Sequence, residues 1–248
     1  VLGYCAVAGH LGRPTFGLQS VGLAGEERPL DRIEAMAARY AEAIAAVHPT
    51  GPVLVAGWSL GAHVALELAR VLLARGRAPA LVALIDADPT IPDPASLPAP
   101  GDVVPWLAEI AAYVERTTGA TLGLSVDDLA RSPDPAPRLL DALRTARVPQ
   151  ALGGAPAAGA ARLTQLAAVF EANSRALSRY RPTPVAAQLT VLQCAGSTFE
   201  AGWAALSDRP VATVTIPGDH YTLVAEPNAA VLARKLDAAA VAALQELS

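Results

Sequence analysis

The feature that most constrains the fold of this chain is the pentapeptide GWSLG at residues 57–61, which has the form G-x-S-x-G. An apolar run at residues 52–56 precedes it, and an uninterrupted helical stretch at residues 62–74 follows it. The apolar run predicts a strand buried on both faces, and the glycines allow a tight turn from that strand into the helix. Ser59, at the apex of this turn, is therefore a candidate nucleophile. A turn without chemical function is the alternative, but it has little reason to carry strain of about 1–3 kcal/mol.

Alternating apolar runs and amphipathic stretches around this pentapeptide predict an α/β fold. The expected strands are residues 15–21, 53–56, 80–85, 189–194 and 211–216. The expected helices are residues 4–11, 33–47, 62–74 and 229 to about 247, with Asp31 as the N-cap of the second. Elements that alternate at these lengths predict a mostly parallel sheet flanked by helices on both faces.

Residues 89–184 break this pattern, because Pro-rich turns such as residues 132–137 separate helical stretches there and no strand is evident. The helices expected in this part are residues 104–116, 138–146 and 162–180. A helical insertion between two halves of a sheet predicts a lid over the strand ends, where α/β proteins bind ligands. We therefore expect a single domain over residues 1–248, with a core at residues 1–88 and 185–248 and a helical lid at residues 89–184.

A serine hydroxyl becomes a good nucleophile when a neighbouring base removes its proton and a carboxylate orients that base. Asp86 follows the strand after Ser59, and His220 follows the last strand in a loop that contains Gly218. Because the carboxyl ends of parallel strands meet at one edge of a sheet, these three side chains are expected to converge. Their order in the chain, Ser then Asp then His, is that of the α/β-hydrolases.

Two other acids compete with Asp86 for the role of orienting His220. Asp88 precedes a proline and can cap a turn, and Asp219 would point away from the imidazole of its neighbour in an extended loop. The position at the end of a strand favours Asp86.

Three further residues are candidates for the wall of a pocket. His63 lies one helical turn after Ser59, where it either lines a pocket or packs the helix against its neighbours. Trp58 and Tyr221 are the other possible pocket residues.

The negative oxygen of an acyl-transfer intermediate needs hydrogen-bond donors. The backbone N–H of Leu60, directly after the nucleophile at the start of a helix, is the expected first donor. The second usually comes from a loop after an earlier strand, and no such strand lies before Val1 in this sequence. We therefore expect the first strand and its loop to be missing from the chain.

The composition argues against a membrane-spanning, a nucleic-acid-binding and a metal-binding protein. Apolar residues make up 52 % of the chain, but charge, Pro or Gly interrupts every apolar run before the roughly 20 residues that a membrane span needs. The net charge of −4 comes from charges spread along the chain, without a basic patch. Cys5 and Cys194 lack the spacing of a metal site and lie in apolar sequence, where buried reduced thiols are common. We therefore expect a soluble, cytoplasmic protein that binds neither nucleic acid, membrane nor metal.

Taken together, these residues resemble the C-terminal type I thioesterase domains of nonribosomal peptide synthetases, which are α/β-hydrolases. The segments that carry the resemblance are FGLQ at 16–19, GEE at 25–27, IEAMA at 33–37, HPTGP at 48–52, GWS at 57–59, LID at 84–86 and GDHY at 218–221. The resemblance implies that Ser59 is the acylated nucleophile, that Asp86 and His220 are its partners, and that residues 89–184 form a mobile lid. Such domains usually begin with a strand and a His-Pro-x-Gly-Gly loop that supplies the second oxyanion donor.

The same resemblance implies a chain-releasing thioesterase. An upstream carrier protein would present a peptidyl or acyl group as a phosphopantetheine thioester, and Ser59 would take that group and release it by hydrolysis or by cyclisation. No bound cofactor is implied. Two alternatives stay open: a free-standing editing (type II) thioesterase or small serine esterase, and a catalytically impaired hydrolase-like binding domain.

Overall fold

Two groups of chain segments form separate units in this computed structural model, which describes residues 2–148 and 159–246. The first unit consists of Val1–Gln19, Arg32–Pro92 and Ala176–Ser248. The second consists of Ser20–Asp31 and Asp93–Arg175. Each unit has a hydrophobic core of its own.

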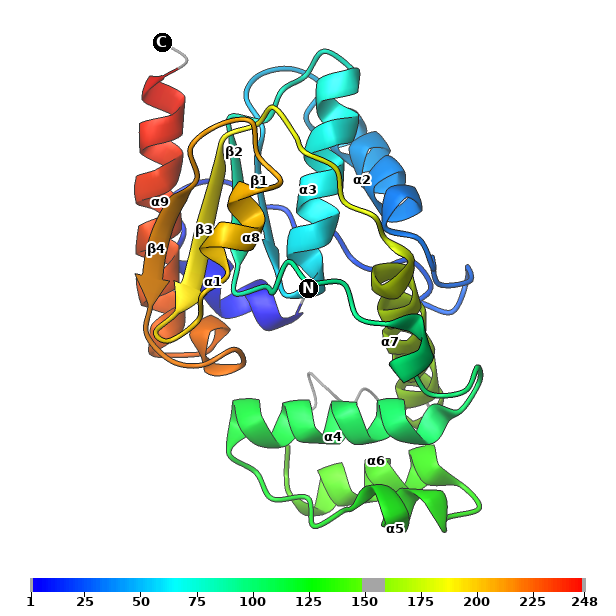
Figure 1. Ribbon diagram of the computed structural model, residues 1–248. Helices are drawn as coiled ribbons and strands as arrows, with labels where there is room; N and C mark the ends of the chain where they lie inside the picture. The colour runs from blue at the N-terminus through cyan, green and yellow to red at the C-terminus, as the bar shows by residue number, and fades with distance from the viewer. Residues whose placement is uncertain (1, 149–158, 247–248) are drawn as a thin grey trace. The chain divides into compact units, whose positions relative to one another are not determined.

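The first unit is built on a parallel sheet of four strands (Figure 1). In order across the sheet, the strands are β1 (Leu54–Trp58), β2 (Leu81–Ile85), β3 (Leu189–Cys194) and β4 (Ala212–Ile216). β2 is buried at every residue, as expected of an inner strand of apolar side chains that is covered on both faces. The last four predicted strands are therefore confirmed, and so is the predicted α/β class.

Helices cover both faces of this sheet (Figure 1). The long helices α2 (Ile33–Val47) and α3 (Leu60–Ala74) lie on one face, and α1 (Cys5–His10) and α9 (Asn228–Gln245) lie on the other. Alternate side chains of β2 join the two cores, with Leu84 packing toward α3 and Ile85 toward α9. The short elements of this unit are η1 (Leu2–Tyr4), α8 (Glu200–Ala204) and η4 (Thr222–Val224).

The described residues of the second unit form helices joined by turns and loops, and none of them forms a strand. It contains η2 (Pro94–Ser96), α4 (Val103–Thr118), α5 (Val126–Ala130), α6 (Pro135–Thr145) and most of α7 (Gly159–Arg179). Its core is formed by apolar side chains of these helices, among them Leu107, Leu139 and Leu163. α5 begins with a capping box in which Ser125 and Asp128 each bond the other's backbone N–H.

Three features predicted from the sequence are wrong. Residues 15–21 form no strand, because no neighbouring strand pairs with them, and Phe16 is 70 % exposed. Arg32 rather than Asp31 occupies the N-cap of α2, without a hydrogen bond from its side chain. Cys5 is exposed, although Cys194 is buried as expected. The last helix ends at Gln245 in the structure, and the end predicted near residue 247 lies outside the described residues.

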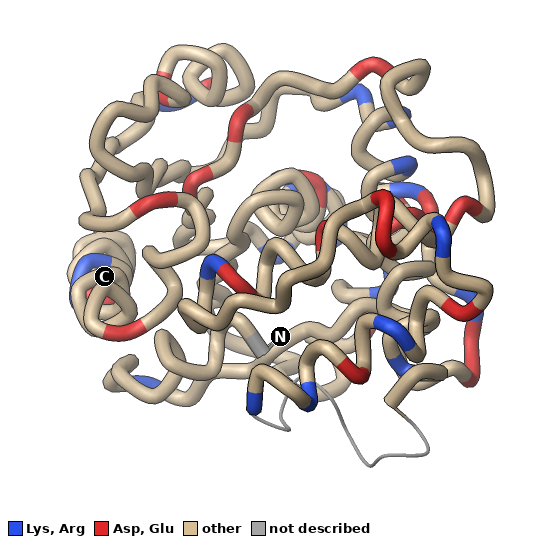
Figure 2. Tube along the Cα trace, turned by 90° about the horizontal axis from the view of Figure 1, so that it is seen from below, with Lys and Arg blue, Asp and Glu red and all other residues tan. Residues whose placement is uncertain are grey.

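Charged residues of both signs are distributed along the whole chain. Figure 2 shows Lys and Arg interspersed with Asp and Glu along the trace, which agrees with charges spread along the sequence. None of the described helices combines the length and the apolar character that crossing a membrane requires.

Candidate active site

Ser59 stands in a sharp turn between β1 and α3. Its backbone has φ 56° and ψ −127°, a conformation that residues other than glycine rarely adopt. Its N–H donates to the carbonyl of Ile85 at 3.0 Å, which joins the turn to the end of β2. A methyl group on Gly57 would collide with the carbonyl oxygen of Gly61, so the turn leaves no room for a side chain there.

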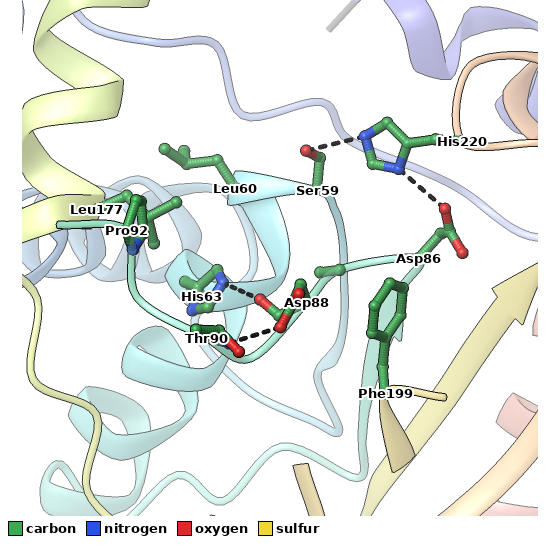
Figure 3. Close-up of a pocket in the computed structure, with 11 residues that line it drawn as sticks. Ser59, Leu60, His63, Asp86, Asp88, Thr90, Pro92, Leu177, Phe199 and His220 are labelled. Carbon is green, nitrogen blue, oxygen red and sulfur yellow. Dashed lines mark hydrogen bonds and ion pairs between the residues drawn. The ribbon is translucent and has the colours of Figure 1, made fainter. Parts of the chain in front are cut away.

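The structure brings Ser59, Asp86 and His220 together (Figure 3). The Nε2 atom of His220 lies 3.1 Å from Oγ of Ser59, and its Nδ1 atom lies 2.8 Å from Oδ2 of Asp86. A carboxylate only accepts hydrogen bonds, so Nδ1–H donates to Asp86 and leaves Nε2 to accept the hydroxyl proton of Ser59. This arrangement can activate a serine hydroxyl; that it does so in this protein stays a prediction.

Asp86 is buried and held by several donors. Its Oδ1 accepts hydrogen bonds from the backbone N–H of Cys194 at 2.9 Å and from Oγ of Ser197 at 3.3 Å. Burial by itself raises the pKa of the Asp86 carboxyl, but the hydrogen bonds from His220 and Cys194 outweigh it and leave the pKa below its usual value. Asp86 is therefore ionised at neutral pH.

Two buried side chains hold the backbone that follows Asp86. Trp203 donates its indole N–H to the carbonyl of Ala87 at 2.7 Å, and Nε2 of His63 donates to the carbonyl of Asp88 at 3.0 Å. These bonds support a segment that begins under strain, because Asp86 has φ 41°. Ser197 and Trp203 went unrecognised in the sequence, where neither belongs to a motif or a periodic stretch.

The two competing acids, Asp88 and Asp219, accept hydrogen bonds from backbone N–H groups of their own turns instead of bonding His220. Oδ1 of Asp88 accepts the N–H of Thr90 at 2.8 Å. Oδ1 of Asp219 accepts the N–H of Tyr221 at 3.0 Å and that of Thr222 at 2.9 Å. Of the three acids, Asp86 is the one that bonds the imidazole of His220.

A cavity of about 420 Å³ opens beside Ser59 (Figure 3). Its apolar lining comes from Leu60, Ala87, Pro92, Leu177 and Phe199. Its polar lining comes from His63, Asp88 and Thr90, together with Ser59, Asp86 and His220. A space of this size can hold a small acyl group.

His63 does both things that its position in the sequence allowed. It lines the cavity, and its ring packs between those of Tyr180 and Trp203. The side chain is 1 % exposed, and this burial lowers the pKa of His63 to about 4, so the ring is neutral at pH 7.

Trp58 and Tyr221 lie outside the cavity lining and against His220. The indole N–H of Trp58 donates to the backbone carbonyl of His220 at 3.1 Å, and the two ring centroids are 5.3 Å apart. Tyr221 places its ring at 88° to the imidazole, with a centroid distance of 5.2 Å. Both aromatic residues therefore contact the candidate base rather than the space beside Ser59.

Leu60 is the first residue of α3 and lines the cavity. N–H groups in the first turn of a helix have no acceptor within that helix, so the N–H of Leu60 is suited to bind an oxyanion. This role remains a prediction. Among the described residues, no group of three or more His, Cys, Asp and Glu side chains could hold a metal ion.

Residues 4–113 match the sequence model of the thioesterase domain family. The resemblance to a thioesterase domain is confirmed. The wild-type Vlm2 thioesterase domain is 25 % identical, with a TM-score of 0.63 over 96 % of this chain and 88 % of that one. A four-domain nonribosomal peptide synthetase, holo-AB3403, has the same fold over 96 % of this chain and 18 % of its own, with a TM-score of 0.79 and 24 % identity.

Two curated synthases share sequence with this thioesterase-like chain. Chondramide synthase cmdD of Chondromyces crocatus is 28 % identical over 93 % of the chain, and microperfuranone synthase of Emericella nidulans is 39 % identical over 37 % of it. The chain spans 6 % of the length of the first synthase and 10 % of the second.

Proposed function

We propose that this chain is a chain-releasing thioesterase domain of a nonribosomal peptide or polyketide synthase, with Ser59, Asp86 and His220 as its catalytic triad. The observation that carries the proposal is the hydrogen-bonded Ser59–His220–Asp86 array beside a cavity, in a chain that resembles thioesterase domains. The matched relatives are much longer synthases, which favours a domain of such an assembly over a free-standing enzyme.

In the first half of the reaction, a carrier protein presents a peptidyl or acyl group as a thioester of its phosphopantetheine arm. His220 takes the hydroxyl proton of Ser59 through Nε2 while Oγ bonds to the thioester carbon. The N–H of Leu60 stabilises the resulting oxyanion, and Asp86 stabilises the imidazolium. The carbon–sulfur bond then breaks, His220 returns its proton to the thiolate, and an ester on Ser59 remains.

In the second half, a nucleophile releases the acyl group. The nucleophile is water, or an amine or hydroxyl within the acyl group itself, and it gives a proton to His220 as it attacks the ester carbon. The bond from that carbon to Oγ of Ser59 then breaks, and His220 returns the proton to Oγ. Water yields a free acid and an internal nucleophile yields a ring. The domain needs no bound cofactor of its own for either step. A lid formed by residues 89–184 remains part of this proposal, as does a cytoplasmic location.

The test is transfer of an acyl group from a loaded carrier protein to Ser59. Intact-mass analysis of the wild type is expected to detect the mass of one acyl group, which tandem analysis assigns to Ser59. The Ser59→Ala variant is expected to form no adduct and to release no product. Ser96→Ala, which changes an exposed serine of the second unit, serves as the control and is expected to behave as the wild type. Normal release by Ser59→Ala would overturn the proposal.

Two other functions are separated by simple observations. A free-standing editing thioesterase or small esterase would lack carrier-protein sequence next to this segment in the full gene product. A catalytically impaired binding domain would not react with a fluorophosphonate probe at Ser59. Labelling of the wild type, together with an adjoining carrier domain, would reject both.

A further inference from the structure

The described lining of the cavity beside Ser59 contains acidic side chains but no Lys or Arg. The acidic residues are Asp86 and Asp88. The carboxylate of Asp86 already accepts hydrogen bonds from Nδ1 of His220 and from the backbone N–H of Cys194. Asp88 is exposed, and its carboxylate accepts the N–H of Thr90 without an ion pair to any described residue. The negative charge of Asp88 is therefore available to a ligand.

The carboxylate of Asp88 is also held in place. The N–H of Thr90 fixes one oxygen, and the buried ring of His63 fixes the backbone carbonyl of the same residue (Figure 3). His63 cannot neutralise Asp88 near pH 7, because its buried ring carries no charge. A carboxylate that needs no reorganisation binds a cation at a lower cost in conformational entropy.

We propose that Asp88 is a specificity residue that binds a protonated amine on the acyl chain. The proposal rests on the proposed function and names its substrate class: acyl groups that carry an ammonium. The carbon chain would contact the apolar lining, for example Leu177 and Phe199, while the ammonium bonds Asp88. An acyl group that ends in a carboxylate would be repelled by the same residue.

The experiment compares three pantetheine thioesters of similar length and different charge. These are 6-aminohexanoyl, heptanoyl and 5-carboxypentanoyl pantetheine, with the amine positive, the alkyl end neutral and the carboxylate negative at pH 7. We expect kcat/KM to fall in that order, by about two- to fivefold per step, as for ion pairs at partly exposed sites.

The variant Asp88→Asn removes the charge and keeps an oxygen that can accept the N–H of Thr90. Asp93→Asn is a closely matched control, since Asp93 also precedes a proline and accepts the N–H two residues on, from Ala95 at 2.9 Å, but does not line the cavity. Asp88→Asn is expected to treat the three thioesters alike, and Asp93→Asn to keep the wild-type order. An unchanged order in Asp88→Asn, or equal rates in the wild type, would overturn the proposal.

A binding measurement tests Asp88 independently of turnover. The same three acyl groups, joined to pantetheine as amides in place of thioesters, are titrated into Ser59→Ala and into Ser59→Ala/Asp88→Asn by calorimetry. Tighter binding of the amine that disappears with Asp88→Asn supports the ammonium site, even if no thioester is cleaved. Equal Kd values in both proteins would reject the site, whereas a failure of the proposed function appears separately as the absence of an adduct on Ser59.

Discussion

At the scale of single residues, Gly57 is the position where a small change should have the largest local effect. Replacing Gly57 by Ala puts a methyl group against the carbonyl of Gly61, so β1 and α3 must separate at the turn that carries Ser59. We expect Gly57→Ala to lower the free energy of unfolding by about 1–3 kcal/mol and to slow labelling of Ser59. Urea denaturation and fluorophosphonate labelling measure the two effects.

Gly9→Ala is the control, because a methyl group at Gly9 has open space around it within α1. It is expected to leave stability unchanged or to raise it by up to about 1 kcal/mol. Equal behaviour of the two variants would contradict the steric explanation.

Trp58 is expected to position His220 through its indole N–H and its ring. Trp58→Phe removes the hydrogen bond and keeps an aromatic ring, and should lower kcat by about two- to tenfold. Trp58→Leu removes both contacts and should lower kcat further. KM should stay near its wild-type value in both, because Trp58 does not line the cavity. Steady-state kinetics with one thioester test this; a change confined to KM would contradict it.

The lowered pKa of Asp86 has a consequence for stability at acid pH. Because the folded pKa lies below the unfolded value of about 3.9, the ionised carboxylate stabilises the fold fully above that value, and the contribution is lost as pH falls through the folded pKa. The stability difference between wild type and Asp86→Asn should therefore be largest near pH 7 and shrink below about pH 4. Urea denaturation at several pH values measures it. A difference that stays constant down to pH 3 would show that the charge of Asp86 is not responsible.

At the scale of elements, the five-residue helix α8 supports the segment after β2 by placing Trp203 beneath it. Trp203→Phe leaves the carbonyl of Ala87 without its donor and should cost about 1–3 kcal/mol of stability, with a loss of kcat. Trp106→Phe is a matched control, since the buried indole N–H of Trp106 has no hydrogen-bond partner among the described residues. Equal losses in the two variants, measured by urea denaturation, would show that ring volume rather than the hydrogen bond matters.

The same elements show what the sequence could and could not predict. Four strands and the long helices were predictable, because continuous apolar runs and 3.6-residue periodicity report burial directly. The strand expected at residues 15–21 failed because alternation of residue types says nothing about whether a partner strand is present to pair with it. α8 is too short to produce a periodic signal.

For the candidate site, sequence reasoning could use strand ends, and these place Ser59, Asp86 and His220 within hydrogen-bonding distance. It could not assign Ser197 and Trp203, because their contacts with Asp86 and Ala87 depend on how the chain folds back after β3. Nor could it predict that Trp58 contacts His220 instead of lining the cavity.

At the scale of the whole molecule, the candidate catalytic residues and the cavity lining all belong to the first unit, and the second unit has a separate core. Leu139 is fully buried in that second core. Leu139→Ala should destabilise the second unit by about 2–5 kcal/mol and leave fluorophosphonate labelling of Ser59 intact. Thermal unfolding and the labelling rate test this together. Loss of labelling in a protein whose first unit is still folded would mean that the triad depends on the second core.

The burial of Cys194 has a practical consequence. Thiol reagents attack the thiolate, and burial, reinforced by nearby Asp86, raises the pKa of Cys194 to about 12. Cys5, the only other cysteine in the sequence, is exposed on α1. A maleimide dye or spin label added to the folded protein at neutral pH should therefore attach at one defined position, on the face of the sheet opposite α3, without any cysteine first being engineered in or out.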